Sequence, residues 1–189
     1  MLTNDPFIWP AEFSSITVFD DIALPSSYNL TVELFPASSQ SSAVIGFKKI
    51  KQFVSKFLQH SIIIPESHHL TLSFLKLSNN VVLVPQDPYD YFLGSVLYRK
   101  LTAITKNYLE IQSLAIDSSI GDRIKYHISS LSDSYSDSLN QTNQWWNMDN
   151  LATNHFKEFP SWENFDITSQ HKFHPKVIQG GKCESDKIR

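Results

Sequence analysis

Two short His-x-Ser/Thr units contain the residues whose types and spacing could perform acid–base chemistry. His69 and Thr71 form the first unit, and His127 and Ser129 form the second. Residues two apart on a strand share a face, so each imidazole would lie beside its own hydroxyl if both units lie on strands. One neutral and one protonated imidazole could then transfer protons near neutral pH.

The second unit also lies close to two cations. The alternation of residues 123–129 places Arg123, Lys125 and His127 on one face of a predicted strand. Ile124, Tyr126 and Ile128 would face the other way. Arg123 and Lys125 could stabilise the charge of a phosphate bound near His127.

Together the two units resemble the paired motifs of the 2H phosphoesterases, which lie on two strands facing one cleft. The resemblance implies a phosphodiesterase acting on a nucleotide or RNA, with His69 and His127 as acid and base and Thr71 and Ser129 holding the phosphate. The chain departs from the family at Ser130, where an apolar residue is expected, and it has no internal duplication. Chance alone predicts about one such unit among 7 histidines. Structural histidines on polar strand faces are therefore the favoured interpretation.

The best-defined local structure follows Pro85 and predicts a helix and a hairpin. Pro88 suits a first helical position, and Asp90 places a carboxylate near the free amides of the first turn. An apolar stripe at helical spacing then predicts a helix over 88–106. The next strand loses its alternation near Gln112 and Ser113, which predicts a β-bulge.

The remaining patterns predict a second helix over 40–59 and strands over 28–35, 61–64, 69–77 and 81–84. This order indicates a two-layer α+β fold, a ferredoxin-like split βαβ with an additional β-hairpin and an irregular C-terminal extension. Both helices would cover one face of a mainly antiparallel sheet. The predicted organisation is an N-terminal arm (1–27), an α+β domain (28–131) and a polar, aromatic extension (132–189).

Composition narrows the classes of partner. The net charge of -3 does not indicate a nucleic-acid partner, and no apolar stretch approaches a membrane span. The first residues contain no signal peptide, so a cytoplasmic or virion-associated location is expected rather than secretion. The first predicted helix carries four lysines, which are interpreted as a solvated face in preference to a phosphate-binding surface: Lys48, Lys49, Lys51 and Lys56.

Residues near the C-terminus include the ligand types of a zinc site. His155, His171, His174 and Cys183 could all bind zinc, but their spacing matches no compact zinc unit. Cys183 is the only cysteine, so no disulfide can form within the chain. The sequence therefore predicts no metal site and no cofactor.

Large aromatic residues near both ends predict a binding role. Polar surroundings prevent either end from forming its own core, and aromatic anchors among polar residues are typical of protein-binding segments. The predicted anchors are Trp9, Trp145, Trp146, Trp162 and Phe165. In the alternative, both ends fold back over the open face of the sheet.

The run DPYDYFLGSVLYRKLTAITKNYLEIQSLAIDSSIGDRIKY, residues 87–126, resembles uncharacterised proteins of tailed bacteriophages. It covers about a fifth of the chain and implies no particular activity. The sequence thus favours a non-enzymatic interaction or structural protein, a bacteriophage component that binds a protein partner or associates with itself. The alternative is the 2H-type phosphodiesterase.

Overall fold

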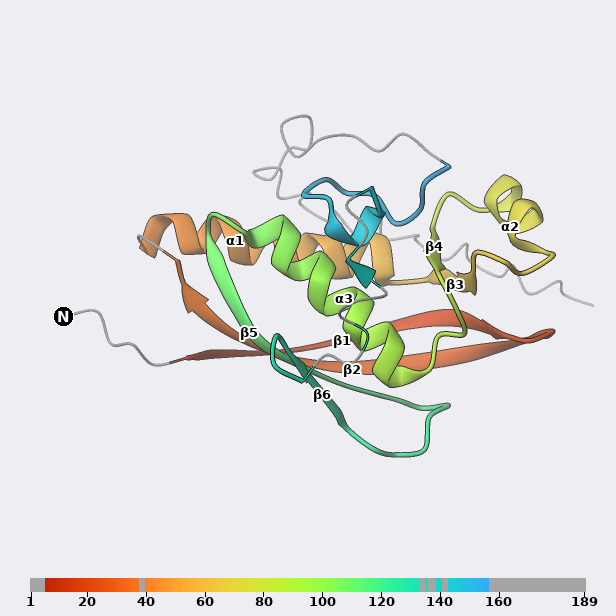
Figure 1. The fold of residues 1–189 in the computed structure, drawn as a ribbon, viewed down its shortest axis with the longest axis horizontal. Helices are drawn as coiled ribbons and strands as arrows, with labels where there is room; N and C mark the ends of the chain where they lie inside the picture. Colours follow the sequence, from red (N-terminus) through yellow and green to blue (C-terminus); the bar gives the residue numbers. More distant parts are fainter. Residues whose placement is uncertain (1–5, 38–39, 133–134, 136–138, 141–142, 157–189) are drawn as a thin grey trace, which may run out of the picture.

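The computed structural model describes residues 6–37, 40–132, 135, 139–140 and 143–156. Within them the strands are β1 (Phe7–Phe19), β2 (Ile22–Pro36), β3 (Ser61–Pro65), β4 (Val81–Val84), β5 (Leu109–Ser118) and β6 (Tyr126–Ser129). The helices are α1 (Gln40–Phe53), continued by the π-helical η1 (Val54–Leu58), α2 (Thr71–Leu77), α3 (Asp90–Thr105) and the 3-10 turn η2 (Trp145–Asn147). The strands form one open mixed sheet in the order β4-β3-β1-β2-β5-β6, which gives an α+β fold (Figure 1).

A long antiparallel hairpin of β1 and β2 forms the centre of the sheet, so the prediction of an irregular arm over 1–27 is wrong for its described part. Pro10 and Pro25 lie where their strands have no second neighbour. β3 pairs with β1 only at residues 15–17, and β5 pairs with β2 only from Tyr28 onward. Pro10 and Pro25 therefore interrupt no second ladder of hydrogen bonds.

α1 and α3 pack against each other and on one face of the sheet, and both helices were predicted (Figure 1). Their apolar residues recur every three or four positions and meet the strand residues that point to the same side. The buried strand residues are Tyr28, Leu30, Val32 and Leu34 of β2 and Ile111, Leu114 and Ile116 of β5. The opposite face of these two strands is mainly polar, as expected for a sheet with one solvated side.

The segment after β3 is a turn followed by α2, so the predicted strand over 69–77 is wrong. Thr71 begins α2, and its hydroxyl donates to the main-chain oxygen of Pro65. Phe74 and Leu75 pack against a second apolar cluster on β3 and β4. The buried or partly buried residues of α2 are Thr71, Phe74 and Leu75. They stand at i, i+3 and i+4, the spacing of one helix face, whereas an alternating strand would bury every second residue.

The order of elements also differs from the predicted ferredoxin-like arrangement. Two strands precede α1, and α2 replaces the strand predicted between β3 and β4, which pair in parallel. The predicted hairpin of β5 and β6 is confirmed. The predicted bulge is confirmed as well, because the register shifts between Glu33 and Leu34 and skips Gln112.

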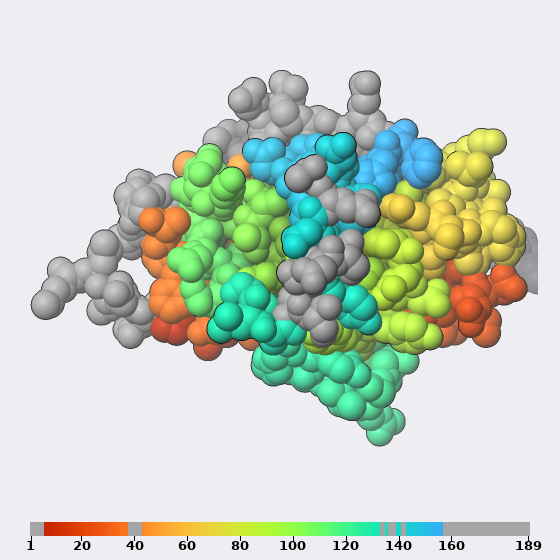
Figure 2. Space-filling model, viewed as in Figure 1, coloured from red at the N-terminus to blue at the C-terminus, as the bar shows by residue number. Residues whose placement is uncertain are grey.

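Trp145 and Trp146 are fully buried and belong to the main core. They lie against α3, and Figure 2 shows the described C-terminal residues, in teal to blue, covering that helix. The indole N–H of Trp145 donates to the main-chain oxygen of Leu83 at 2.8 Å. This part of the predicted extension is therefore an integral layer of the fold.

The same segment covers the outer edge of β4. The main-chain N–H of Leu83 donates to the oxygen of Thr153 at 2.9 Å. The side chains of Thr153 and Asn154 both donate to the main-chain oxygen of Val81. These bonds satisfy an edge strand that would otherwise offer its main-chain groups to another chain.

Candidate functional site

His69 and His127 are not brought together. His69 lies in the turn after β3, whereas His127 lies on β6 at the opposite edge of the sheet. β1, β2 and β5 separate these strands, which at about 4.8 Å per strand places β3 and β6 on the order of 19 Å apart. Thr71 is buried, and the hydroxyl of Ser129 lies 3.0 Å from that of Ser132. The geometry provides no common cleft for the two histidines.

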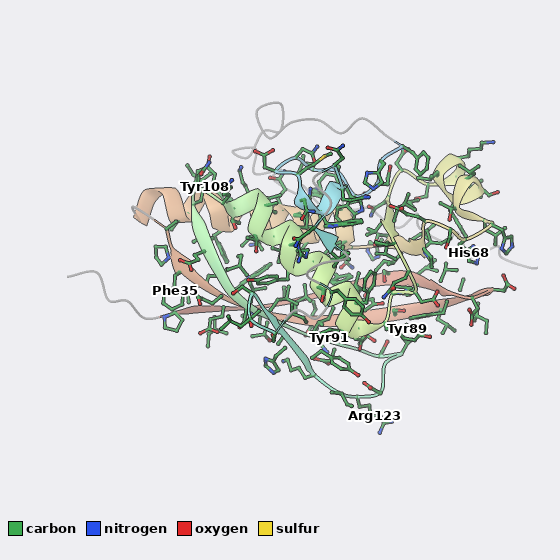
Figure 3. The ribbon with its side chains drawn as sticks, in the orientation of Figure 1. Phe35, His68, Tyr89, Tyr91, Tyr108 and Arg123 are labelled. Atoms are coloured by element: carbon green, nitrogen blue, oxygen red, sulfur yellow. The ribbon has the colours of Figure 1, made fainter. Side chains whose placement is uncertain are left out.

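The cations near His127 have other surroundings. Arg123 lies in the β5–β6 connection with a φ of 65°, and Figure 3 shows it far from His68, the neighbour of His69. Lys125 Nζ lies 3.2 Å from the Thr31 hydroxyl and 3.9 Å from the Asp117 carboxylate. Lys125 thus belongs to a polar network on the solvated face of the sheet.

An apolar groove of about 290 Å³ opens where the start of β1 and the end of β2 meet α1. Every lining residue is apolar: Phe7, Leu34, Phe35, Pro36, Ala43, Val44, Phe47 and Leu109. Phe47 is held by edge contacts with the rings of Phe7 and Trp9, at centroid distances of 5.7 and 5.6 Å. Phe7 is 56% exposed and Val44 is 52% exposed, so the rim of the groove is open to solvent.

A basic stripe on α1 continues from this groove. Val44, Lys48 and Lys51 stand at i, i+4 and i+7, which places them in line on one exposed helix face. Lys56 adds a further exposed cation on η1, and residues 40–58 contain no Asp or Glu. Lys49 is instead buried, with its Nζ 4.7 Å from the centroid of the Tyr108 ring. On the α1 side, the groove therefore borders a helix whose charged residues are all lysines, whereas Glu110 on β5 pairs with the groove residue Phe35.

Three possible metal ligands meet at the other end of the sheet. Asp21 lies in the β1–β2 turn, and His68 and His69 lie between β3 and α2. The Oδ1 atom of Asp21 is 3.7 Å from His68 Nε2 and 3.6 Å from His69 Nδ1. Figure 3 shows His68 at the end of the molecule opposite Phe35, which marks the groove.

Lys100 is a buried cation on α3. Its Nζ donates to the main-chain oxygens of Trp145 and Met148 at 2.8 and 2.9 Å and lies 3.4 Å from Asn150 Oδ1. Burial lowers the pKa of Lys100 to about 7, and the charge of Asp149 opposes that shift. Lys100 is fully buried. Its hydrogen bonds hold the C-terminal segment against α3.

Asp90 is a buried carboxylate at the start of α3. Its Oδ2 accepts a hydrogen bond from the main-chain N–H of Ser118 at 2.9 Å. Burial raises the pKa of Asp90, and hydrogen bonds from Ser118 oppose that rise. A cavity of about 340 Å³ lies beside it, with Tyr126 donating to Asp122 at 2.6 Å on its wall. These carboxylates already hold partners within the β5–β6 connection, which indicates a structural role.

The predicted partner-binding residues separate into three groups. Trp9 is half-buried against Phe47 behind the groove. Trp145 and Trp146 lie inside the chain's own core, so the prediction that they anchor a partner is wrong; the end folds back, as in the alternative, but onto α3 and the edge of β4 and not over the open face of the sheet. Trp162 and Phe165 lie outside the described residues.

Of the possible zinc ligands near the C-terminus, His155 is described, and its Nε2 lies 3.1 Å from a Glu66 carboxylate oxygen. His171, His174 and Cys183 lie outside the described residues. The sequence-based interpretation missed Asp21 and His68, although the adjacent His68-His69 pair was a visible signal. It also missed the burial of Lys100, whose position three residues after Leu97 lies on the apolar side of the helix.

No protein-family model matches this chain, and no curated protein matches it. In the part of the chain that the structure describes, no helix combines the length and apolar character that a membrane span requires.

Proposed function

We propose that this chain is a non-enzymatic interaction protein that binds a protein partner through the apolar groove between β1, β2 and α1. One observation supports this most directly: the groove is lined only by apolar residues, yet among the residues that the structure describes its rim is open to solvent. The proposed binding surface therefore lies at the start of β1, beside Trp9, and not at the C-terminal tryptophans.

The exposed rim favours occupation by a partner. Phe7 and Val44 each leave about half of their surface in water. Covering that surface would contribute about 1 kcal/mol per residue, since full burial of such side chains is worth about 1.5–3 kcal/mol. Open apolar surface rimmed by polar groups is typical of a protein-binding site.

The stripe of Lys48 and Lys51 defines the chemistry of the partner. A segment that places an apolar side chain in the groove would run along α1 past both ammonium groups. Carboxylates on that segment would complement them, and opposite charges across an interface raise the association rate and select the partner. We therefore propose an acidic segment with apolar anchors. The overall charge of -3 and the apolar lining make nucleic acid a poorer match.

The resemblance of residues 87–126 to bacteriophage proteins supports placing this partner in a phage assembly, and virion association is part of the proposal. A second copy of the chain is the competing occupant. Sedimentation equilibrium distinguishes the two, because self-association would give a concentration-dependent mass in the absence of any peptide.

Two synthetic peptides test the proposal. Both contain the same leucine and phenylalanine anchors, one with glutamates between them and the other with lysines at the same positions. Fluorescence anisotropy at low salt should show binding of the acidic peptide, weakened as salt screens the charges. Equal affinity for both peptides, or binding of neither, would contradict the proposed partner chemistry.

A further inference from the structure

The β1–β2 turn and the β3–α2 connection, far apart in sequence, place three ligand atoms side by side. All three atoms, one each from Asp21, His68 and His69, lie within 4.8 Å of one another. Successive side chains usually diverge, yet the rings of His68 and His69 stack at a centroid distance of 4.6 Å and both face Asp21. We propose that Asp21, His68 and His69 form a binding site for a divalent transition-metal ion of the zinc type.

The distances from Asp21 to both imidazoles fit such an ion after a small movement of the side chains. Zinc binds imidazole nitrogen and carboxylate oxygen at about 2.0–2.2 Å, so two ligands of a tetrahedral site lie roughly 3.4 Å apart. The two contacts of Asp21 Oδ1 are 3.7 and 3.6 Å. Closing these two gaps requires shifts of a few tenths of an ångström, and the two imidazole nitrogens, which lie within 4.8 Å of each other, must approach by at most about 1.4 Å. The Asp21 and His69 side chains are 83% and 66% exposed, so they can make these shifts without disturbing the core.

The donor set selects the class of ion. Two imidazole nitrogens and one carboxylate oxygen suit zinc, cobalt, nickel or copper, whereas calcium and magnesium prefer ligands that are all oxygen. Three protein ligands leave one tetrahedral position to water. The ion would connect the tip of the central hairpin to the loop before α2 and so stabilise both connections.

His68 is the least exposed of the three ligands, and its existing hydrogen bonds limit the affinity of the site for the ion. Its side chain is 7% exposed; its Nε2 pairs with the main-chain oxygen of Asp20, and its Nδ1 accepts from the N–H of Leu70 at 3.2 Å. An ion at Nε2 replaces the hydrogen bond to Asp20 and places the ring proton on Nδ1, which releases the Leu70 amide to solvent. Binding therefore exchanges two hydrogen bonds for the metal ligation. A micromolar rather than nanomolar dissociation constant follows.

The test uses the full chain carrying His171→Ala, His174→Ala and Cys183→Ser, which removes the alternative ligands near the C-terminus. Isothermal titration with zinc chloride at pH 7.5 should give one micromolar site, and cobalt chloride should give visible d–d absorption. Thermal unfolding with zinc should show a raised Tm that chelator reverses.

Single substitutions in that background then locate the ion. His69→Ala and Asp21→Asn should each weaken zinc binding by at least roughly 10- to 100-fold, because the loss of a residue that only supports a metal ligand already costs that much affinity. Both side chains are exposed, so an unchanged metal-free Tm confirms folding. His127→Ala, an exposed histidine on β6, should leave the affinity unchanged. Absence of zinc binding in the background chain, or equal affinity after His69→Ala, would overturn the site.

Discussion

Lys100 Nζ lies 2.8 Å from the main-chain oxygen of Trp145, and this bond ties the middle of α3 to the C-terminal segment inside the core. The aromatic rings of Phe53 and Trp145 also approach the ammonium, at 5.8 and 5.6 Å from their centroids. Three acceptors favour the charged amine, but desolvation outweighs them, because the pKa of Lys100 falls to about 7.

The lowered pKa of Lys100 predicts a pH-dependent stability. Between about pH 7 and the ordinary lysine pKa of 10.5, the unfolded chain holds a proton on this lysine that the folded chain has lost. The free energy of unfolding should therefore rise with pH in that window, by up to about 1.4 kcal/mol per pH unit. Urea unfolding at pH 7.0 to 9.5 measures the slope. This range avoids the region above pH 10, where the pKa of Tyr28, raised to about 12 by burial, adds an opposite slope.

Lys100→Met is the matched control, since methionine keeps much of the volume and cannot titrate. The rise with pH seen in the original chain should be absent from this variant. A variant that retains the full slope would show that Lys100 does not titrate in this window.

Trp145→Ala should be strongly destabilising. The substitution empties a fully buried site and removes the indole donor to Leu83, and truncation of a buried tryptophan costs about 3–5 kcal/mol. Urea unfolding followed by circular dichroism gives the loss. Phe156→Ala, at an exposed aromatic residue of the same segment, should change stability by less than about 0.5 kcal/mol. Similar small effects at both positions would contradict the packing of this segment.

Gly94→Ala tests the contact of α3 with the sheet. Alanine normally stabilises a helix by about 1 kcal/mol relative to glycine. Here a β-carbon would lie 2.6 Å from Ile128 Cδ1 and 2.7 Å from Ile116 Cγ2, so the strands or the helix must move. We expect a net loss of about 1–3 kcal/mol in chemical denaturation. A gain in stability would show that α3 lies farther from β5 and β6.

Sequence periodicity predicted α1, α3, the β5–β6 hairpin and the bulge at Gln112, because each depends on local spacing. It failed where long-range pairing decides the outcome. The irregular arm predicted over 1–27 is instead β1 and the start of β2, where Pro10 and Pro25 are tolerated because neither has a second neighbouring strand. The sequence of 69–77 suggested a strand, yet the buried or partly buried residues of α2 are Thr71, Phe74 and Leu75, which follow helical spacing.

The candidate sites were harder to predict for the same reason. The groove forms only where the ends of β1 and β2 meet α1, and no local pattern indicates that meeting. The approach of Asp21 to His68 depends on the parallel pairing of β1 with β3, which no local pattern indicates.

The most direct test of the proposed function is the affinity of the acidic peptide for a variant with a charge at the groove. Val44→Glu places a carboxylate on the apolar rim, where it repels the acidic peptide and disfavours burial of its anchors. Leu72→Glu makes the same change at an exposed leucine of α2, away from the groove. The proposal predicts an affinity reduced roughly 10-fold or more for Val44→Glu, equivalent to about 1.4 kcal/mol, and an affinity close to that of the original chain for Leu72→Glu. Equal affinities for the two variants would contradict the groove as the binding surface.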